Sequence, residues 1–233
     1  MKITYIYHSS FLTETKNFYL LFDYFKGQIP DLNADKPLVV FASHRHADHF
    51  SEKIFELEKQ HKNIWFVLSA DIWRKRVPQP LQERTLFIGS GKQETFAGLQ
   101  VETLKSTDEG VAFLIRTDEG FVYHAGDLND WAWTGEPERF NQTMRKAYRR
   151  QIEKLAEKEI KAAFVVLDPR QGTEFAAGMT WFLQHVQAEE VFPMHCWDDY
   201  SVISKYKKLE EAKPYAAKIK KNIKEPGEIF TVL

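Results

Sequence analysis

Short apolar runs dominate the first half of the chain, and stretches with helical spacing become frequent in the second half. Runs rich in β-branched and aromatic residues, bounded by turn residues, predict β-strands. Apolar residues that recur every three or four positions predict amphipathic helices. We therefore expect strands at residues 3–7, 18–22, 38–42, 64–68, 85–88, 99–103, 111–116, 121–124, 163–167, 190–192 and 229–233, and helices at residues 52–60, 140–159 and 178–187 and from about residue 200.

The order of these elements indicates the fold class. Strand-rich sequence followed by alternating helices and strands is typical of an α/β protein in which two sheets are covered by helices. The chain contains no internal repeat, low-complexity segment or obvious linker. Because 233 residues can bury one large core, we expect a single domain that spans residues 1–233.

Composition narrows the classes of partner and compartment. The formal net charge of −1 argues against a surface built for nucleic acid or an anionic membrane. The single cysteine, Cys196, excludes an intrachain disulfide and is typical of a reducing compartment. The first residues lead directly into strand-like sequence, and no apolar stretch approaches the length of a membrane span. We therefore expect a cytoplasmic protein without a membrane partner, and a homo-oligomer remains open.

Four potential metal ligands lie within six positions directly after the apolar run at residues 37–42: His44, His46, Asp48 and His49. An extended backbone sends residues two apart to the same face, so His44 and His46 can point together. Where the chain then turns, a carboxylate and a third imidazole can reach a second cation nearby. Zinc, iron and manganese accept this mixture of nitrogen and oxygen ligands. A solvated loop rich in histidine is the alternative, but packing explains none of the four residues.

The spacing of these four residues resembles the signature of the metallo-β-lactamase superfamily of metal-dependent hydrolases. The segments 8–12 and 20–23 are similar to the branch that holds ascorbate-6-phosphate lactonase-like and phosphodiesterase-like members. Segment 123–127 resembles the one whose Asp bridges two metals, and segment 191–195 resembles the late strand whose His completes the second site. These matches keep the expected order over residues 3–200. The resemblance implies a four-layer αββα sandwich.

The resemblance also implies two divalent metal ions, with zinc as the first choice and manganese or iron as alternatives. Asp127 would bridge the two ions. Without the rest of the pattern, an Asp in the position of Asp127 is more often a turn residue, and a His in the position of His195 is more often an ordinary buried histidine. The implied ligands are His44 and His46 for one ion, and Asp48, His49 and His195 for the other.

One departure from the pattern concerns the first metal site. Most relatives place another histidine between the first motif and the bridging Asp, whereas this chain has no histidine between His61 and His124. Asp108 is the best candidate for the missing ligand, because a carboxylate binds the same cations at similar distances. Glu109 or a water could serve instead, and residues 106–110 also read as a plain turn.

Several further residues are expected to surround the metals. Asp48 is the candidate catalytic residue, because it could orient a metal-bound hydroxide or carry its proton. Asp23 could hold a ligand imidazole in the right tautomer, or could lie in a surface turn. Trp131 and Trp133 could form a pocket wall, or simply cover the core. Two more residues are candidates for contact with the substrate or the ligands: Asn129 and His8.

These features favour a hydrolase that uses a metal-bound hydroxide on a small ester, lactone or phosphodiester. A nucleic-acid phosphodiesterase would need a basic path to the metals, and the basic run at residues 145–150 is followed by glutamates that indicate a solvated helix face. A di-iron redox enzyme would need a flavin partner domain. A non-catalytic metal-binding protein is the remaining alternative, but six ligands with an open position suit catalysis better than a closed site.

Overall fold

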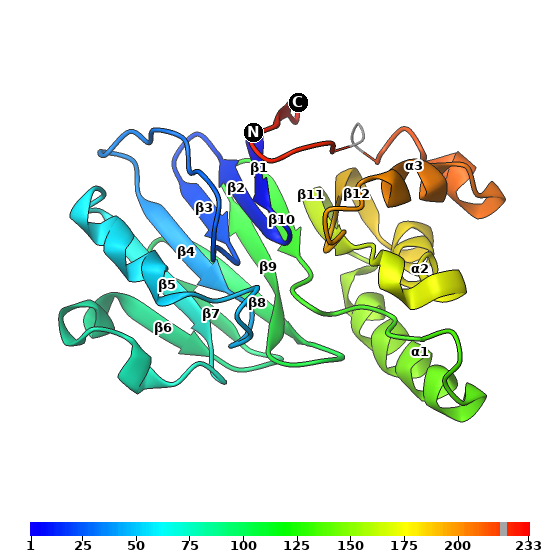
Figure 1. Cartoon of the computed structure of the whole chain (residues 1–233). Helices are drawn as coiled ribbons and strands as arrows, with labels where there is room; N and C mark the ends of the chain where they lie inside the picture. Colours follow the sequence, from blue (N-terminus) through cyan, green and yellow to red (C-terminus); the bar gives the residue numbers. More distant parts are fainter. Residues whose placement is uncertain (220–222) are drawn as a thin grey trace.

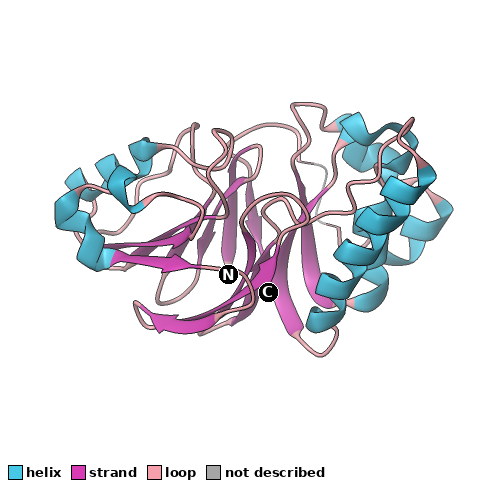
Figure 2. Cartoon of the chain, turned by 90° about the horizontal axis from the view of Figure 1, so that it is seen from below, coloured by secondary structure: helices cyan, strands magenta, loops and turns pink. Residues whose placement is uncertain are grey.

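The structure, a computed structural model, describes residues 1–219 and 223–233. Its strands form two sheets that pack against each other in the middle of the molecule, with helices on both outer sides (Figures 1 and 2). The described part of the chain contributes seven strands to the first sheet and six to the second. The predicted fold class, an α/β sandwich of two helix-covered sheets, is thereby confirmed.

The elements follow one another as the apolar runs predict. In the first sheet the strand order is β13-β1-β2-β3-β4-β5-β6, and in the second it is β12-β11-β10-β9-β8-β7. The strands are β1 Lys2–Tyr7, β2 Ser10–Glu14, β3 Tyr19–Phe22, β4 Leu38–Ala42, β5 Ile64–Ser69, β6 Thr85–Ile88, β7 Gln93–Phe96, β8 Leu99–Lys105, β9 Val111–Thr117, β10 Gly120–His124, β11 Glu159–Val166, β12 Gln187–Met194 and β13 Ile229–Thr231. The α-helices are α1 Glu138–Ile152, α2 Ala177–His185 and α3 Ser201–Lys207, and 3₁₀ helices span Glu52–Lys59, Arg74–Arg76, Gln79–Arg84, Glu153–Leu155, Pro169–Glu174 and Glu210–Tyr215.

Both sheets combine an antiparallel and a parallel part. Strands β3 to β6 are parallel, as are β10 to β12, and the remaining neighbours pair antiparallel. Parallel strands in register end at the same edge of a sheet. The carboxyl ends of β3 and β4 therefore lie together in one sheet, as do those of β10, β11 and β12 in the other.

The main core lies between the two sheets and under the α-helices. Phe11 of β2 packs on Phe164 of β11 with ring centroids 4.4 Å apart, so aromatic rings join the two sheets. A second core covers the outer face of the first sheet, where Phe55 of the helix Glu52–Lys59 packs on Phe66 with ring centroids 5.1 Å apart. Strands such as β4 are buried on both faces, which explains why they read as continuous apolar runs.

Some elements differ from the sequence-based expectation. The predicted helix 140–159 ends earlier, because α1 stops at Ile152, a single 3₁₀ turn follows, and β11 already begins at Glu159. The predicted strand 190–192 is the centre of the longer β12. Two strands are not predicted: β2, whose buried face includes the polar residues Ser10 and Thr13, and β7, which is largely exposed. Both lack the alternation of apolar and polar residues that marks a half-buried strand.

The α-helices are short. The longest, α1, has 15 residues, whereas a membrane span needs about 20 apolar residues. Its sequence also carries five Arg or Lys side chains at positions 139, 145, 146, 149 and 150. Within residues 1–219 and 223–233, no helix has the length and apolarity to cross a membrane.

The turn between β8 and β9 lies directly on the carboxyl end of β4. Val111 N donates a hydrogen bond of 2.9 Å to Ser43 O, which links the second sheet to the first. The preceding residue, Gly110, has a φ of +67°, and a Cβ there would lie 2.0 Å from Ser43 O and 2.5 Å from His44 Cβ. Only glycine permits this approach, so Gly110 sets the distance between the two sheets at the metal motif.

Gly91 offers a matched comparison for this contact, because it has the same φ of +67° but open space for 4 Å around the point that a Cβ would occupy. We expect Gly91→Ala to lower the free energy of unfolding by about 1 kcal/mol through backbone strain alone. Gly110→Ala should lose about 2 kcal/mol more, because the methyl group must displace Ser43 and His44. Urea unfolding of both variants measures the difference, and equal losses would contradict the role assigned to Gly110.

Candidate metal centre

The candidate ligands lie at one edge of the sandwich, where strands of both sheets end. The segment from Ser43 to His49 follows β4, and His8 follows β1. Asp127 comes shortly after β10 and His195 directly after β12. Because rigid sheets hold strand ends at fixed separations, residues far apart in the sequence are brought to a common centre.

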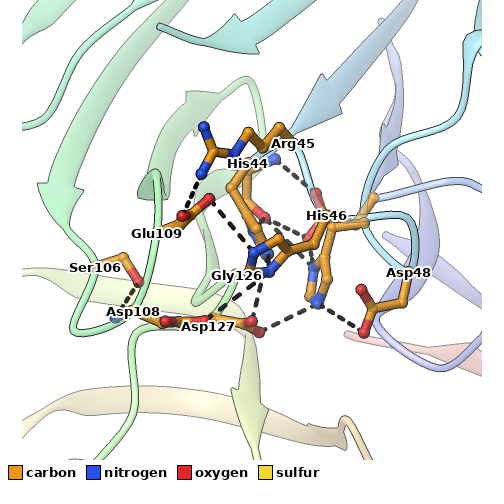
Figure 3. A network of polar contacts seen from close by, with 12 residues as sticks. His44, Arg45, His46, Asp48, Ser106, Asp108, Glu109, Gly126 and Asp127 are labelled. Atoms are coloured by element: carbon orange, nitrogen blue, oxygen red, sulfur yellow. Dashed lines mark hydrogen bonds and ion pairs between the residues drawn. The ribbon is translucent and has the colours of Figure 1, made fainter. Parts of the chain in front are cut away.

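His44, His46 and Asp127 form a first group whose ligand atoms all lie within 4.8 Å of one another. His44 Nε2 lies 3.0 Å from His46 Nδ1 and 3.4 Å from Asp127 Oδ2. Figure 3 shows Asp127 below the two imidazoles, with Glu109 to one side and Asp48 to the other. This geometry agrees with the expectation that His44 and His46 point to the same place.

His8, Asp48, His49 and His195 form a second group, also within 4.8 Å of one another. Asp127 joins the two groups, since its Oδ1 lies 3.2 Å from His49 Nε2 and 3.5 Å from His195 Nε2 while its Oδ2 faces His44. This is the arrangement that a bridging carboxylate requires. The second group also includes His8, which was not among the predicted ligands. We expected His8 only to contact the substrate or the ligands.

Four buried atoms at this centre have no hydrogen-bond partner: His8 Nε2, His49 Nε2, His195 Nε2 and Asp127 Oδ1. A buried polar atom without a partner costs about 1–3 kcal/mol, so four such atoms gathered at one point call for a compensating group. Imidazole nitrogens and carboxylate oxygens at these separations fit divalent cations of the zinc type. The donor set therefore fits the metals that the sequence implies.

Asp23 holds the ligand loop from beneath. Its carboxylate is fully buried and accepts hydrogen bonds of 2.7 Å from Ser43 N, Ser43 Oγ and the Nδ1 of His49. The bond to Nδ1 leaves Nε2 of His49 to face Asp127. Asp23 thus orients a ligand imidazole, which is the role expected of it, and it does not lie in a surface turn.

A second buried carboxylate, Asp168, orients the His195 ring in the same way. This role of Asp168 was not predicted from the sequence. Its Oδ2 lies 3.0 Å from His195 Nδ1 and also accepts from Arg170. Burial raises the pKa of Asp168, but the hydrogen bonds from His195 and Arg170 outweigh it and lower the pKa to about 2. The sequence does contain a signal for this role, because Asp168 follows the apolar run of β11 in the same way that Asp23 follows β3.

The electrostatics of the centre favour bound cations. Burial and the neighbouring His49 lower the pKa of His44 to about 4, so His44 is neutral at pH 7, the form that binds metals. Burial raises the pKa of Asp127, but the imidazoles of His49 and His195 outweigh it and keep Asp127 ionised. Burial lowers the pKa of His49, yet Asp127 and Asp23 raise it well above its ordinary value. The position at His49 therefore favours a positive charge, whether a proton or a metal ion.

Asp108 and Glu109 approach His46 from two sides, and neither belongs to the two groups described above. Asp108 Oδ2 lies 3.9 Å from His46 Nδ1, the nitrogen that also faces His44. Glu109 Oε2 lies 3.4 Å from His46 Nε2, and its Oε1 accepts a 2.6 Å hydrogen bond from Arg45. Burial and the charge of Asp127 raise the pKa of Asp108. Asp108 is thus placed near the first group, with its side chain half exposed.

A cleft of about 440 Å³ opens above the centre, within the range of small-molecule sites. Trp131 and Trp133 form one wall with their rings stacked 5.8 Å apart, and Trp197 stands opposite with 45% of its surface exposed. Aromatic walls beside the metal ligands suit a substrate with an apolar portion. The cleft is lined by His46, Asp48, Thr107, Asp108, Asp127, Trp131, Trp133, Phe140, Met144, Arg170, His195 and Trp197.

Asn129 does not line this cleft, contrary to our expectation that it could contact the substrate. It is buried, and its side-chain amide donates a 2.8 Å hydrogen bond to Gln171 Oε1. Gln171 in turn donates to the carbonyls of Asp130 and Ala132. Asn129 therefore stiffens the loop that carries the two tryptophans.

The fold and the site together define a metal-binding protein built on a two-sheet α/β sandwich, with its ligands at the strand ends. Residues 2–133 match the model of a family described as beta-lactamase superfamily domain. Because this match covers more than half of the chain, the chain belongs to the metallo-β-lactamase superfamily. The predicted membership of this superfamily of metal-dependent hydrolases is confirmed.

Solved structures with the same fold cover nearly the whole chain. Igni18, a metallo hydrolase from the archaeon Ignicoccus hospitalis, is similar with a TM-score of 0.66 and 19% identity over 98% of this chain and 97% of its own. YhfI, a metallo-beta-lactamase fold protein from Bacillus subtilis, gives 0.61 and 15% identity over 98% of both chains. An isothiocyanate hydrolase from Delia radicum gut bacteria gives 0.55 and 13% identity over 99% of both chains. The comparison with curated proteins finds no match.

The backbone at His8 supports a role in metal binding. Its φ is +55°, in the left-handed region that favours glycine, and its N–H donates a 2.8 Å hydrogen bond to Tyr5 Oη. His195 has a φ of +64°, and its N–H donates to His8 O at 3.4 Å. Strained backbone of this kind persists only where surrounding contacts hold it, and it clusters at functional sites.

We expect His8→Ala to weaken metal binding at the second group by at least about tenfold, while metal binding at the first group is unchanged. Competition with a chromophoric chelator, read together with elemental analysis, measures the affinity and the equivalents. His61→Ala is the matched control, because His61 is equally buried but its Nε2 contacts Lys36 O, away from the centre. The same metal affinity in both variants would remove His8 from the ligands.

Proposed function

We propose that this protein is a hydrolase that holds two divalent metal ions, with zinc as the first choice, and that cleaves a small ester, lactone or phosphodiester. The family match supports a metallo-hydrolase, and the segment around His8 supports the lactonase-like and phosphodiesterase-like branch. The observation that carries the proposal is the set of four buried, unpartnered atoms at the base of an open cleft. A purely structural site would be closed, whereas a catalytic site keeps an open position.

Divalent cations at this centre would lower the pKa of a shared water towards neutrality, orient the electrophile and stabilise the departing oxygen. Asp127 holds the two groups of ligands at a fixed separation. Asp48 lines the cleft at the second group, 3.6 Å from His8 Nε2. Burial raises the pKa of Asp48, but the nearby imidazoles of His8 and His49 outweigh it and lower the pKa, so Asp48 is ionised at neutral pH. An ionised carboxylate there can accept a hydrogen bond from the attacking water and orient it.

In the first group, Asp108 is our proposed third protein ligand besides Asp127. Asp108 approaches Nδ1 of His46, the nitrogen that also faces His44. Glu109 instead approaches Nε2 of His46 and accepts a hydrogen bond from Arg45. A small movement of the half-exposed Asp108 side chain would bring it into the group. Glu109 then serves to hold the His46 ring, much as Asp23 and Asp168 hold theirs.

The cleft indicates the shape of the substrate. Its stacked tryptophans and Trp197 offer planar, apolar walls on two sides of the ligands. Arg170 lies between them, with its guanidinium 4.3 Å from the Trp197 ring centroid and 6.0 Å from that of Trp133. Since Asp168 already neutralises this guanidinium, the walls favour an apolar group of the substrate rather than a strongly charged one.

Metal content separates the assigned ligands. We expect about two equivalents per chain in the unmodified protein, about one in Asp108→Ala, and a disturbance of both ions in Asp127→Ala, because Asp127 contacts both groups. Elemental analysis of protein purified without chelators gives the equivalents. Asp118→Ala, an exposed carboxylate in the turn before β10, is the control and should keep both ions. Equal metal content in Asp108→Ala and the unmodified protein would refute the assignment of Asp108.

Turnover separates the hydrolase from its alternatives. We expect the metal-loaded protein to hydrolyse members of at least one class in a panel of aryl esters, lactones and phosphodiesters, and chelation to abolish that activity. Product formation measured by absorbance at several metal concentrations provides the test. Full metal loading without turnover on the whole panel would favour a non-catalytic metal-binding protein. Iron with a visible spectrum that depends on oxygen would favour a redox enzyme.

A further inference from the structure

A second pocket involves the metal motif through Arg45, whereas the cleft is lined by His46 and Asp48 of the same motif. This second pocket has a volume of about 340 Å³, enough for one mononucleotide-sized group. It belongs to the segment between β5 and β6, together with one residue of the metal motif. We call it the basic pocket, and it is lined by Arg45, Asp71, Trp73, Lys75 and Arg76.

The indole of Trp73 is held out into solvent on a rigid turn. It is 59% exposed, although a large aromatic side chain gains from burial. The flanking residues Ile72 and Val77 are almost completely buried, and Arg76 N and Val77 N donate to Trp73 O and Arg74 O within the turn. The exposed ring is therefore presented by an anchored segment rather than by a loose loop, as a stacking platform requires.

Three cationic side chains line the pocket together with Trp73. Lys75 Nζ lies 4.5 Å from the Trp73 ring centroid, and no ion pair is found for it within the described residues. Arg45 and Arg76 are each oriented through one nitrogen, by Glu109 and Glu52 respectively. Because a guanidinium has five N–H donors, both keep donors for an anion. The pocket thus combines an aromatic face with fixed and free positive charge.

Asp71 adds a hydrogen-bond acceptor to the pocket. Its Oδ2 accepts a 3.0 Å hydrogen bond from Arg45 N, whereas its Oδ1 is buried and has no partner. An unpartnered carboxylate oxygen among cations suits a ligand that brings both a negative group and a hydroxyl or amino donor. A sugar phosphate has this combination, and a nucleoside monophosphate adds an aromatic base that can stack on the exposed Trp73 ring.

The pocket is connected to the metal centre through one residue. Arg45 stands between His44 and His46, and its Nη2 bonds Glu109, whose other oxygen approaches His46 Nε2 at 3.4 Å. Figure 3 shows this link between Arg45, Glu109 and the ligand imidazoles. A group bound in the basic pocket would therefore lie next to the centre but outside the cleft.

We infer that the basic pocket binds a nucleoside monophosphate unit, either as a free nucleotide or as the end of a single strand. Trp73 stacks on the base, Asp71 accepts a hydrogen bond from the sugar, and Lys75 with the two arginines binds the phosphate. Its use as a substrate subsite rests on the hydrolase proposed above, whereas the binding itself does not. The net charge of −1 conceals this pocket, because carboxylates outnumber cations in the rest of the chain.

Calorimetric titration of the metal-loaded protein with adenosine monophosphate tests the inference. We expect Trp73→Ala and Lys75→Glu each to weaken binding by at least about tenfold, through loss of stacking and of charge. Trp73→Phe should restore most of the affinity, because it keeps an aromatic face. Adenosine and inorganic phosphate should each bind at least about tenfold more weakly than the nucleotide, since each makes only part of the contacts. Lys146→Glu, which changes an exposed lysine on α1 by the same charge as Lys75→Glu, is the charge-matched control and should bind normally.

Two further arms separate the possible outcomes. Asp127→Ala should still bind the nucleotide, even where it loses metal and turnover, so a failure of the hydrolase proposal leaves this result intact. A 5′-phosphorylated single-stranded tetranucleotide that binds more tightly than the mononucleotide identifies a strand end as the source, and equal affinity identifies the free nucleotide. Binding that survives Trp73→Ala and Lys75→Glu, or that is lost only in Asp127→Ala, would place the phosphate on the metals and overturn the inference.

Discussion

The metal centre depends on one buried carboxylate. Asp23 follows β3 with a φ of +44°, is inaccessible to solvent, and is ionised because His124, His49 and Ser43 surround it. Taking a charge out of water is costly unless the charged group is paired and hydrogen-bonded. Asp23 meets this condition by binding the backbone of Ser43, its hydroxyl and the His49 ring together. It therefore fixes the loop after β4 and the orientation of a ligand in a single interaction.

The second sheet repeats this device. Asp168 follows β11 as Asp23 follows β3, and each carboxylate binds the Nδ1 of a histidine that follows the neighbouring parallel strand, His195 in one sheet and His49 in the other. The two Nε2 atoms then face Asp127 from opposite sheets. Parallel pairing accounts for the repetition, because it brings the carboxyl ends of adjacent strands together. Each half of the sandwich thus contributes one oriented imidazole, and the bridging carboxylate lies where the halves meet.

The sequence predicts most of the fold and a large part of the site, for reasons that individual residues make clear. The apolar run of β4 is buried on both faces, so its strand is unmistakable, and the ligand spacing after it can be read directly. His8 is harder to assign, because its place beside His195 depends on how β1 and β12 lie together across the two sheets. Asp168 is missed because its partner, His195, follows the neighbouring strand of the same sheet and is 27 residues away along the chain. Asn129 is the opposite case, a residue predicted near the substrate whose side-chain amide instead hydrogen-bonds within the protein.

One short motif, the bent segment that follows β4, contributes to two pockets. His44 and His46 lie at the metal centre, whereas Arg45, the residue between them, lines the basic pocket. Glu109 then ties the two sides together by contacting both Arg45 and His46. A change in the charge of a group bound beside Arg45 would be felt at the His46 ring through this shared carboxylate. The identity of the intervening residue therefore matters to the centre, although it supplies no ligand itself.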